Sequence, residues 1–140
     1  MKWAMMMAGL AVAGLAGCTE SNVEASGEEA EAKSGAMLFA QNCAACHGAN
    51  GRGEGIDVSG LEQVPPDLTL IAERSGGVFP ADEVLAKVHG YGGPGHFGDM
   101  PDFADIGAGE TVMWETENGQ KIATPRALVD LMGYLEGLQR

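Results

Sequence analysis

Cys43-Ala44-Ala45-Cys46-His47, residues 43–47, places two thiols and an imidazole within five positions of the chain. Two cysteines at this spacing can each form a thioether with one of the adjacent vinyl groups of a haem. The histidine that follows is then carried beneath the iron as its proximal ligand. The stretch therefore predicts covalent attachment of one haem c through Cys43 and Cys46, with His47 as a ligand to the haem iron.

Two other kinds of site use the same pair of cysteines. A thioredoxin-like dithiol shares the Cys-x-x-Cys spacing, but it lies within a βαβ pattern that this sequence does not show. A structural zinc site needs four ligands, and outside the motif the chain offers only Cys18, His89 and His96. Haem attachment is favoured over both, which remain as alternatives.

Around this motif, residues 34–140 resemble a class I c-type cytochrome with a single haem c, in the form that a lipoprotein anchor ties to a bacterial membrane. The resemblance implies a small all-α fold in which helices and glycine-rich loops surround the haem. Shorter helices are predicted over residues 68–73 and 80–89, the second from its acidic first turn and the glycine at its end. Asn118-Gly119 lies between two short segments of residues 112–124 and predicts a small β-hairpin inserted into that fold.

The family's first helix carries a glycine and an aromatic residue that pack across its last helix. Ser34 is the expected N-cap of the first helix, and Gly35 and Phe39 match the two packing residues. The last helix is expected to open with Thr124 as its N-cap, because apolar residues recur after it at three- and four-residue spacing. Tyr134 is the expected aromatic partner on that last helix.

The N-terminal residues have the features of an export signal. An uncharged apolar run over residues 4–13 is too short for a comfortable membrane span, so residues 1–17 are predicted to be a signal peptide. Leu15-Ala16-Gly17-Cys18 resembles a bacterial lipobox, which implies that Cys18 is lipidated. An ordinary signal peptide with an incidental cysteine is the alternative. We expect the protein to lie on the periplasmic side of a bacterial membrane, held there by its lipid anchor.

The composition is strongly acidic. The chain carries 20 acidic and 8 basic side chains, for a net charge of −12, and loss of Lys2 with the leader brings this to −13. Such a surface argues against nucleic-acid binding and favours docking to a basic patch on a redox protein partner, at a rate that falls as salt rises. Solubility alone is the alternative reason for the charge. Residues 18–33 are acidic and nearly without large apolar side chains, so they are expected to form a flexible, unstructured tether.

A second axial ligand is expected in a loop that lacks regular secondary structure. Gly98-Asp99-Met100-Pro101 resembles the family's methionine loop, which implies that Met100 is the sixth ligand of the iron. A thioether stabilises ferrous iron, so a His/Met pair raises the reduction potential of the haem. His96 and Met113 are the alternative sixth ligands.

Two further residues are expected to contact the cofactor. Val64-Pro65-Pro66-Asp67 resembles the segment that lines the proximal side of the haem, where a backbone carbonyl accepts the Nδ1 proton of the axial histidine. Either Pro65 or Pro66 can supply that carbonyl, and we assign Pro66 to the cofactor site. Trp114 is expected either to donate its indole proton to a haem propionate or to pack in the core.

The resemblance implies a carrier of single electrons rather than an enzyme, and such a carrier needs no general acid, base or nucleophile. A second hypothesis is a sensor or enzyme in which the same fold binds a gas or a peroxide at an open sixth position. The match around Met100 argues against an open position. A third hypothesis is an electron-entry subunit that is docked permanently to a larger redox complex.

Overall fold

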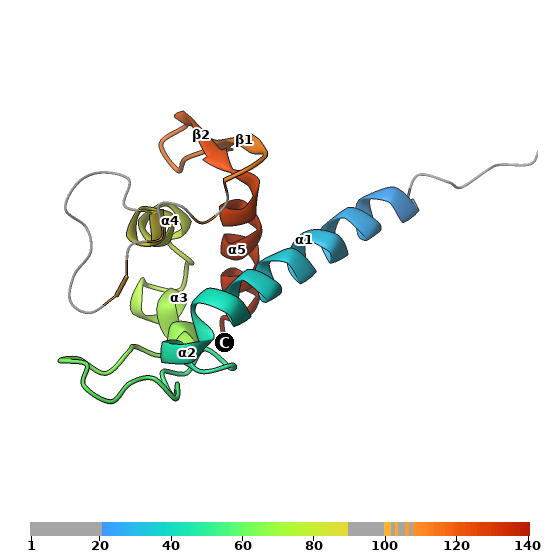
Figure 1. Ribbon diagram of the computed structural model, residues 1–140. Coiled ribbons are helices and arrows are strands. Elements are labelled where there is room, and N and C mark those ends of the chain that lie inside the picture. The colour runs from blue at the N-terminus through green and yellow to red at the C-terminus, as the bar shows by residue number, and fades with distance from the viewer. Residues whose placement is uncertain (1–20, 90–99, 102, 104–105, 107) are drawn as a thin grey trace, which may run out of the picture.

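The computed structural model describes residues 21–89, 100, 101, 103, 106 and 108–140 (Figure 1). These residues form five α-helices, one short 3-10 helix and a two-stranded antiparallel hairpin, with loops between them. Their order is α1 (Ser21–Asn42), α2 (Ala44–His47), η1 (Leu68–Leu70), α3 (Ile71–Arg74), α4 (Ala81–His89), β1 (Thr111–Glu115), β2 (Lys121–Pro125) and α5 (Arg126–Gly137). The predicted helical fold with a small inserted hairpin is therefore confirmed.

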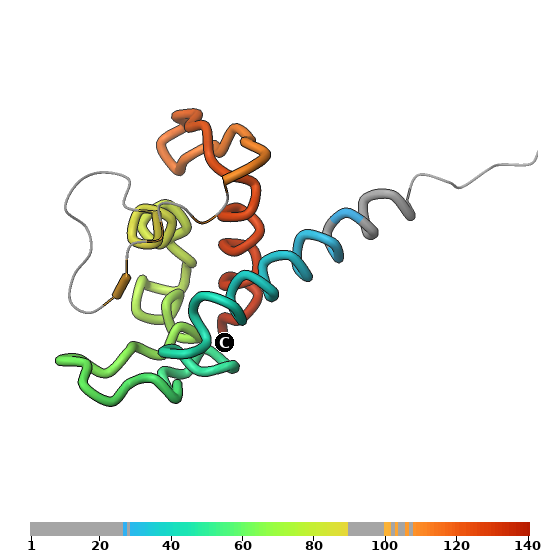
Figure 2. Tube along the Cα trace, viewed as in Figure 1, coloured from blue at the N-terminus to red at the C-terminus, as the bar shows by residue number. Residues whose placement is uncertain are grey.

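The crossing of α1 and α5 forms the centre of the molecule (Figure 2). Phe39 of α1 is 1% exposed, and its ring centroid lies 5.4 Å from that of Tyr134 on α5. The two helices approach so closely at Gly35 that an added Cβ would collide with the backbone carbonyl oxygen of Asp130. α5 supplies its apolar face to this core through Leu128, Leu131, Met132 and Leu135, all of them buried. The predicted packing of the first helix across the last is confirmed.

The first helix starts earlier than the sequence suggested. α1 begins at Ser21, so the prediction that Ser34 caps it is wrong, and residues 21–33 are helical rather than unstructured. Glutamate and alanine are the commonest residues of this segment, and both are good helix formers. An ion pair of 3.1 Å between Glu31 and Arg126 also ties the segment to α5. This part of α1 extends away from the crossing with α5 (Figure 1).

The inserted hairpin lies directly before α5 in the chain. Its two strands pair from Thr111 with Pro125 to Glu115 with Lys121, and Gly119 in the turn has φ of +80°. The Asn118-Gly119 pair thus marks a hairpin, as predicted. Asp82, in the first turn of α4, accepts hydrogen bonds from the Trp114 indole and from the backbone amide of Glu117, both at 2.7 Å. These two contacts fix the hairpin against α4.

The last helix begins one residue later than the predicted cap implies. Thr124 pairs with Val112 in the hairpin, which keeps its backbone extended, and its hydroxyl donates to the Ile122 carbonyl at 3.2 Å. Pro125 takes the cap position and α5 starts at Arg126, so the prediction of Thr124 as N-cap is wrong. Within the part of the chain that the structure describes, no helix has the length and apolar character needed to span a membrane.

Candidate functional site

A cavity of about 540 Å³ opens between α2, the proline segment (residues 64–67), α4 and α5. Its lining brings together three parts of the chain that lie far apart in the sequence: the haem motif with Cys43, Cys46 and His47, then Pro66, and then Met100. Apolar side chains from α1, α3, α4 and α5 complete its walls. The volume is in the range of cofactor pockets, about 300–1,000 Å³. The two thiols, the imidazole and the thioether are a donor set that suits a covalently attached haem.

His47 lies at the end of α2 and is oriented by the proline segment. Its Nδ1 donates to the Pro66 carbonyl oxygen at 3.4 Å, which leaves Nε2 as the nitrogen for a metal. Burial lowers the pKa of His47, and the Pro66 carbonyl acts in the opposite direction. A lowered pKa favours the neutral imidazole, which is the form that ligates a metal. Of the two prolines considered, Pro66 is the one whose carbonyl meets the histidine.

Glycines on the loop after α2 allow close contact with the haem motif. Gly53 has φ of +82°, its amide donates to the His47 carbonyl at 2.8 Å, and an added Cβ would collide with the Pro65 carbonyl oxygen. An added Cβ at Gly55 would collide with the backbone carbonyl oxygens of Ala45 and Cys46. The sequence analysis predicted glycine-rich loops around the haem, but it did not show that these two glycines lie against the backbone of α2 and of the proline segment.

The two cysteines face the same cavity from the start and middle of the haem motif. Burial raises the pKa of the Cys43 thiol to about 11, and the neighbouring Cys46 adds to this shift. Cys43 is therefore a protonated thiol at neutral pH, which is the species that adds across a vinyl group to give a thioether. Cys46 Sγ lies 3.6 Å from the Asp57 carbonyl oxygen, to which its S–H group donates.

The candidates for a sixth ligand are separated by their places in the fold. Met100 is half-buried and lines the cavity together with His47. Met113 lies on β1, where it is 62% exposed, and it does not belong to the cavity lining. His96 and Cys18 lie outside the described residues. Among the residues that are described, no group of three or more potential ligands is arranged to hold a metal ion such as zinc.

Trp114 does not line this cavity, and of its two expected roles the structure supports packing in the core. Its indole N–H donates to Asp82 Oδ1 at 2.7 Å rather than being free for a propionate. Its ring lines a separate hollow beside Met132 of α5 and packs against the hydrophobic core. The position of Asp82 at the start of α4 explains the difference, because it offers a carboxylate on the side of α4 that faces the hairpin.

Two cations line the cavity that sequence reasoning did not select. Arg74 extends from α3, and Lys87 extends from α4. They are two of the 8 basic residues of an acidic chain, and they outnumber the one carboxylate of the lining, Glu83, which suits a ligand with carboxylate groups, such as the propionates of haem. Charged residues on short helices usually indicate a solvent-exposed face, which is why the sequence carried no signal for this role.

A comparison with protein families agrees with the geometry of the cavity. A family model described as Cytochrome c matches residues 32–138, a stretch that contains the whole cavity lining. No curated protein and no solved structure matches the chain.

Proposed function

The chain belongs to the cytochrome c family, and on that premise we propose that it carries single electrons on one haem c ligated by His47 and Met100. Membership of the family implies covalently bound haem c and a role in electron transport. The observation that supports the finer proposal is that His47 and Met100 line the same cavity as the two cysteines. The haem supplies the chemistry, a one-electron change at its iron.

The side chains of the cavity then divide the remaining work. Cys43 and Cys46 would hold the haem covalently, and Arg74 and Lys87, which line the same cavity, are the candidates to pair with its propionates. The apolar walls exclude water, and the thioether of Met100 is a soft ligand that favours ferrous iron. Burial and the His/Met pair together favour a raised reduction potential. This arrangement uses no acid, base or nucleophile, so we propose a carrier and not an enzyme.

Met100 provides the decisive test, because a bound thioether would give the iron a characteristic absorption band and would block its sixth position to other ligands. In the haem-loaded protein we expect a far-red sulfur-to-iron absorption band and no response to carbon monoxide. Met100→Ala is expected to lose the band, bind carbon monoxide and have a lower reduction potential. The measurement is the absorption spectrum in both oxidation states, with a potentiometric titration.

Met113→Ala is the matched control for this experiment, because Met113 is exposed on β1 and should leave the spectrum unchanged. Ready binding of carbon monoxide by the unmutated protein would contradict the closed carrier. It would favour the alternative in which the haem binds a gas or a peroxide. Co-purification with a large redox complex would instead favour the electron-entry subunit.

We further propose that the carrier is exported and anchored. In this proposal residues 1–17 are a signal peptide, Cys18 is lipidated, and α1 connects the anchor to the haem domain on the periplasmic side. Cys18→Ser is expected to move the protein from the membrane fraction to the soluble periplasmic fraction. An unmutated protein that is already soluble would contradict the anchor.

The acidic charge of −12 supports a redox protein partner with a basic docking patch. Electron transfer to such a partner should slow as ionic strength rises. A rate that does not change with salt would leave solubility as the reason for the charge.

A further inference from the structure

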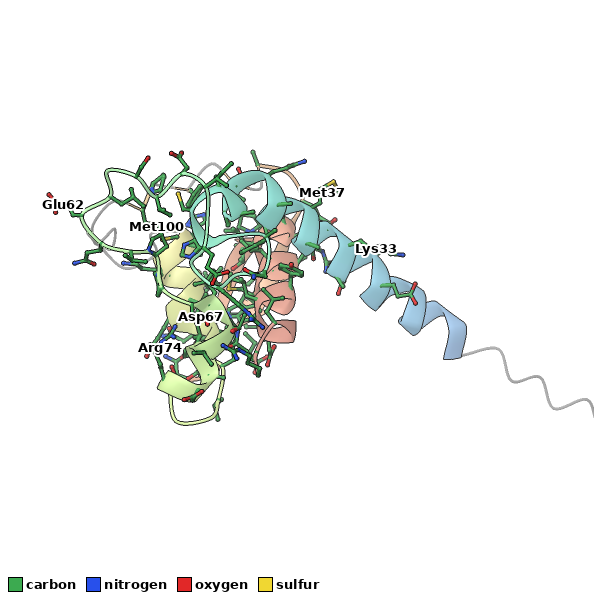
Figure 3. All side chains as sticks on the ribbon, turned by 90° about the horizontal axis from the view of Figure 1, so that it is seen from below. Lys33, Met37, Glu62, Asp67, Arg74 and Met100 are labelled. Carbon is green, nitrogen blue, oxygen red and sulfur yellow. The ribbon has the colours of Figure 1, made fainter. Side chains whose placement is uncertain are left out.

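Asp67 follows the proline whose carbonyl meets His47, and it is held on three sides. Its Oδ1 accepts hydrogen bonds from the Thr69 amide at 2.9 Å and the Thr69 hydroxyl at 2.6 Å. Its Oδ2 lies 3.1 Å from Arg140 Nη2, and its backbone carbonyl accepts from Arg74 Nη2 at 2.9 Å. The Pro66 carbonyl belongs to the peptide unit that joins Pro66 to Asp67, so these contacts restrict its position. Figure 3 shows Asp67 and Arg74 beside one another.

Arg140 also forms two hydrogen bonds with Thr69, two residues after Asp67. Its amide donates to the Thr69 carbonyl at 3.2 Å, and its Nε donates to the Thr69 hydroxyl at 2.8 Å. The neighbouring Gln139 donates to the Leu68 carbonyl and accepts from the Ala72 amide, both at 2.9 Å. The residues after α5 are thereby joined to η1 and α3. α5 packs across α1, and α1 leads into the haem motif that contains His47. The residues after α5 therefore connect the helix that precedes His47 to the segment whose carbonyl accepts from it.

These interactions hold the Pro66 carbonyl, whose hydrogen bond with His47 is long. His47 Nδ1 lies 3.4 Å from the Pro66 carbonyl oxygen, whereas N–H···O bonds are usually about 2.7–3.2 Å long. A small displacement of the carbonyl therefore decides how strong the hydrogen bond is. A stronger bond at Nδ1 makes the imidazole a better donor to a metal at Nε2. Better donation stabilises ferric iron and lowers the reduction potential.

We propose that Asp67 and Arg140 are positioning residues for the axial histidine, which hold the Pro66 carbonyl within reach of His47 Nδ1 and so lower the reduction potential of the haem. This inference rests on the proposed ligation of the iron by His47. Hydrogen bonds from Thr69, and the nearby Arg140, outweigh partial burial and hold the pKa of Asp67 below its usual value, so Asp67 is an anion at neutral pH. A purely structural ion pair is the competing explanation, because the side chains of Arg140 and Asp67 are 52% and 23% exposed.

The test compares Arg140→Gln and Asp67→Asn in the haem-loaded full-length protein. Each variant removes the ion pair, while Asp67→Asn keeps a side-chain oxygen that can accept from Thr69. We expect both to raise the reduction potential, with a change of about threefold in the ferrous-to-ferric ratio at a fixed solution potential. That ratio converts to about 30 mV at 59 mV per tenfold change for one electron. The NMR resonance of the His47 Nδ1 proton in the ferrous protein is expected to move as well.

Arg126→Gln is the matched control, because Arg126 also forms ion pairs from α5, with Glu31 and Glu110, away from the cavity. It should change neither the potential nor the resonance. Variants that lose stability while both signals stay unchanged would overturn the positioning role and leave a structural one. Absence of axial histidine signals from the unmutated protein would overturn the ligation by His47 and this inference with it. The two failures are therefore distinguishable.

Discussion

Phe39→Ala is expected to lower the free energy of unfolding by about 3–5 kcal/mol, as is usual when a buried aromatic ring is removed from a core. Phe39 is 1% exposed, packs on the Tyr134 ring at 5.4 Å and also lines the cavity. Its loss therefore removes contacts from both the helix crossing and the wall of the haem site. Urea unfolding of the haem-loaded protein, followed by circular dichroism, gives the difference.

Met37→Ala is the control for this experiment, because it lies on the same helix but is 58% exposed. A change within about 0.5 kcal/mol is expected there, as for most surface substitutions. If Phe39→Ala were as mild as Met37→Ala, the α1–α5 crossing would not be the centre of the core. Coupling with Tyr134→Leu in a double-mutant cycle is expected to be about 0.5–1.5 kcal/mol, the usual range for aromatic pairs.

Gly35→Ala is expected to lower the free energy of unfolding by about 1–3 kcal/mol, as overpacking of a tight contact does. Alanine is the better helix former by about 1 kcal/mol, so a loss of stability reports the collision alone. That collision is with the Asp130 carbonyl oxygen and with Tyr134 Cβ, which lies 2.8 Å from the added atom. Because α1 ends directly before Cys43, we also expect weaker packing around the haem, measured as a shift in reduction potential.

Gly27→Ala separates the collision from helix propensity. Gly27 lies in the same helix, and an added Cβ there meets nothing within 4 Å. The substitution is expected to leave stability unchanged or raise it by up to about 1 kcal/mol. A Gly35→Ala protein that is also stabilised would show that α1 and α5 do not approach closely at this position.

Several features of the fold follow from local sequence alone. The apolar spacing of α5, the acidic first turn of α4 and the Asn118-Gly119 turn each act over a few residues, and each predicted its element. The haem motif also acts locally, because covalent reach from two cysteines and the following histidine needs only residues 43–47. Even the crossing partners Gly35 and Phe39 were predicted, although only through resemblance to the cytochrome c family.

Local sequence misled where a distant partner decides the outcome. Residues 21–33 have a composition that suits either a disordered or a helical segment, and the contact of Glu31 with Arg126, far along the chain, favours the helix. For Trp114 the local sequence leaves two roles open, at the haem or in the core, because nothing in its neighbourhood shows that Asp82 accepts its indole proton. In both cases the missing information was a pairing between elements.

The sequence by itself determined that this chain has a covalent haem motif, a helical fold and a strongly acidic surface, because spacing, periodicity and charge can be counted along the chain. Only the tertiary structure decided that Met100 and not Met113 shares the cavity of His47, since both are methionines in plausible segments. It also decided that Arg140 reaches Asp67 across 73 positions. Such contacts depend on how helices pack, and no spacing rule along the chain records them.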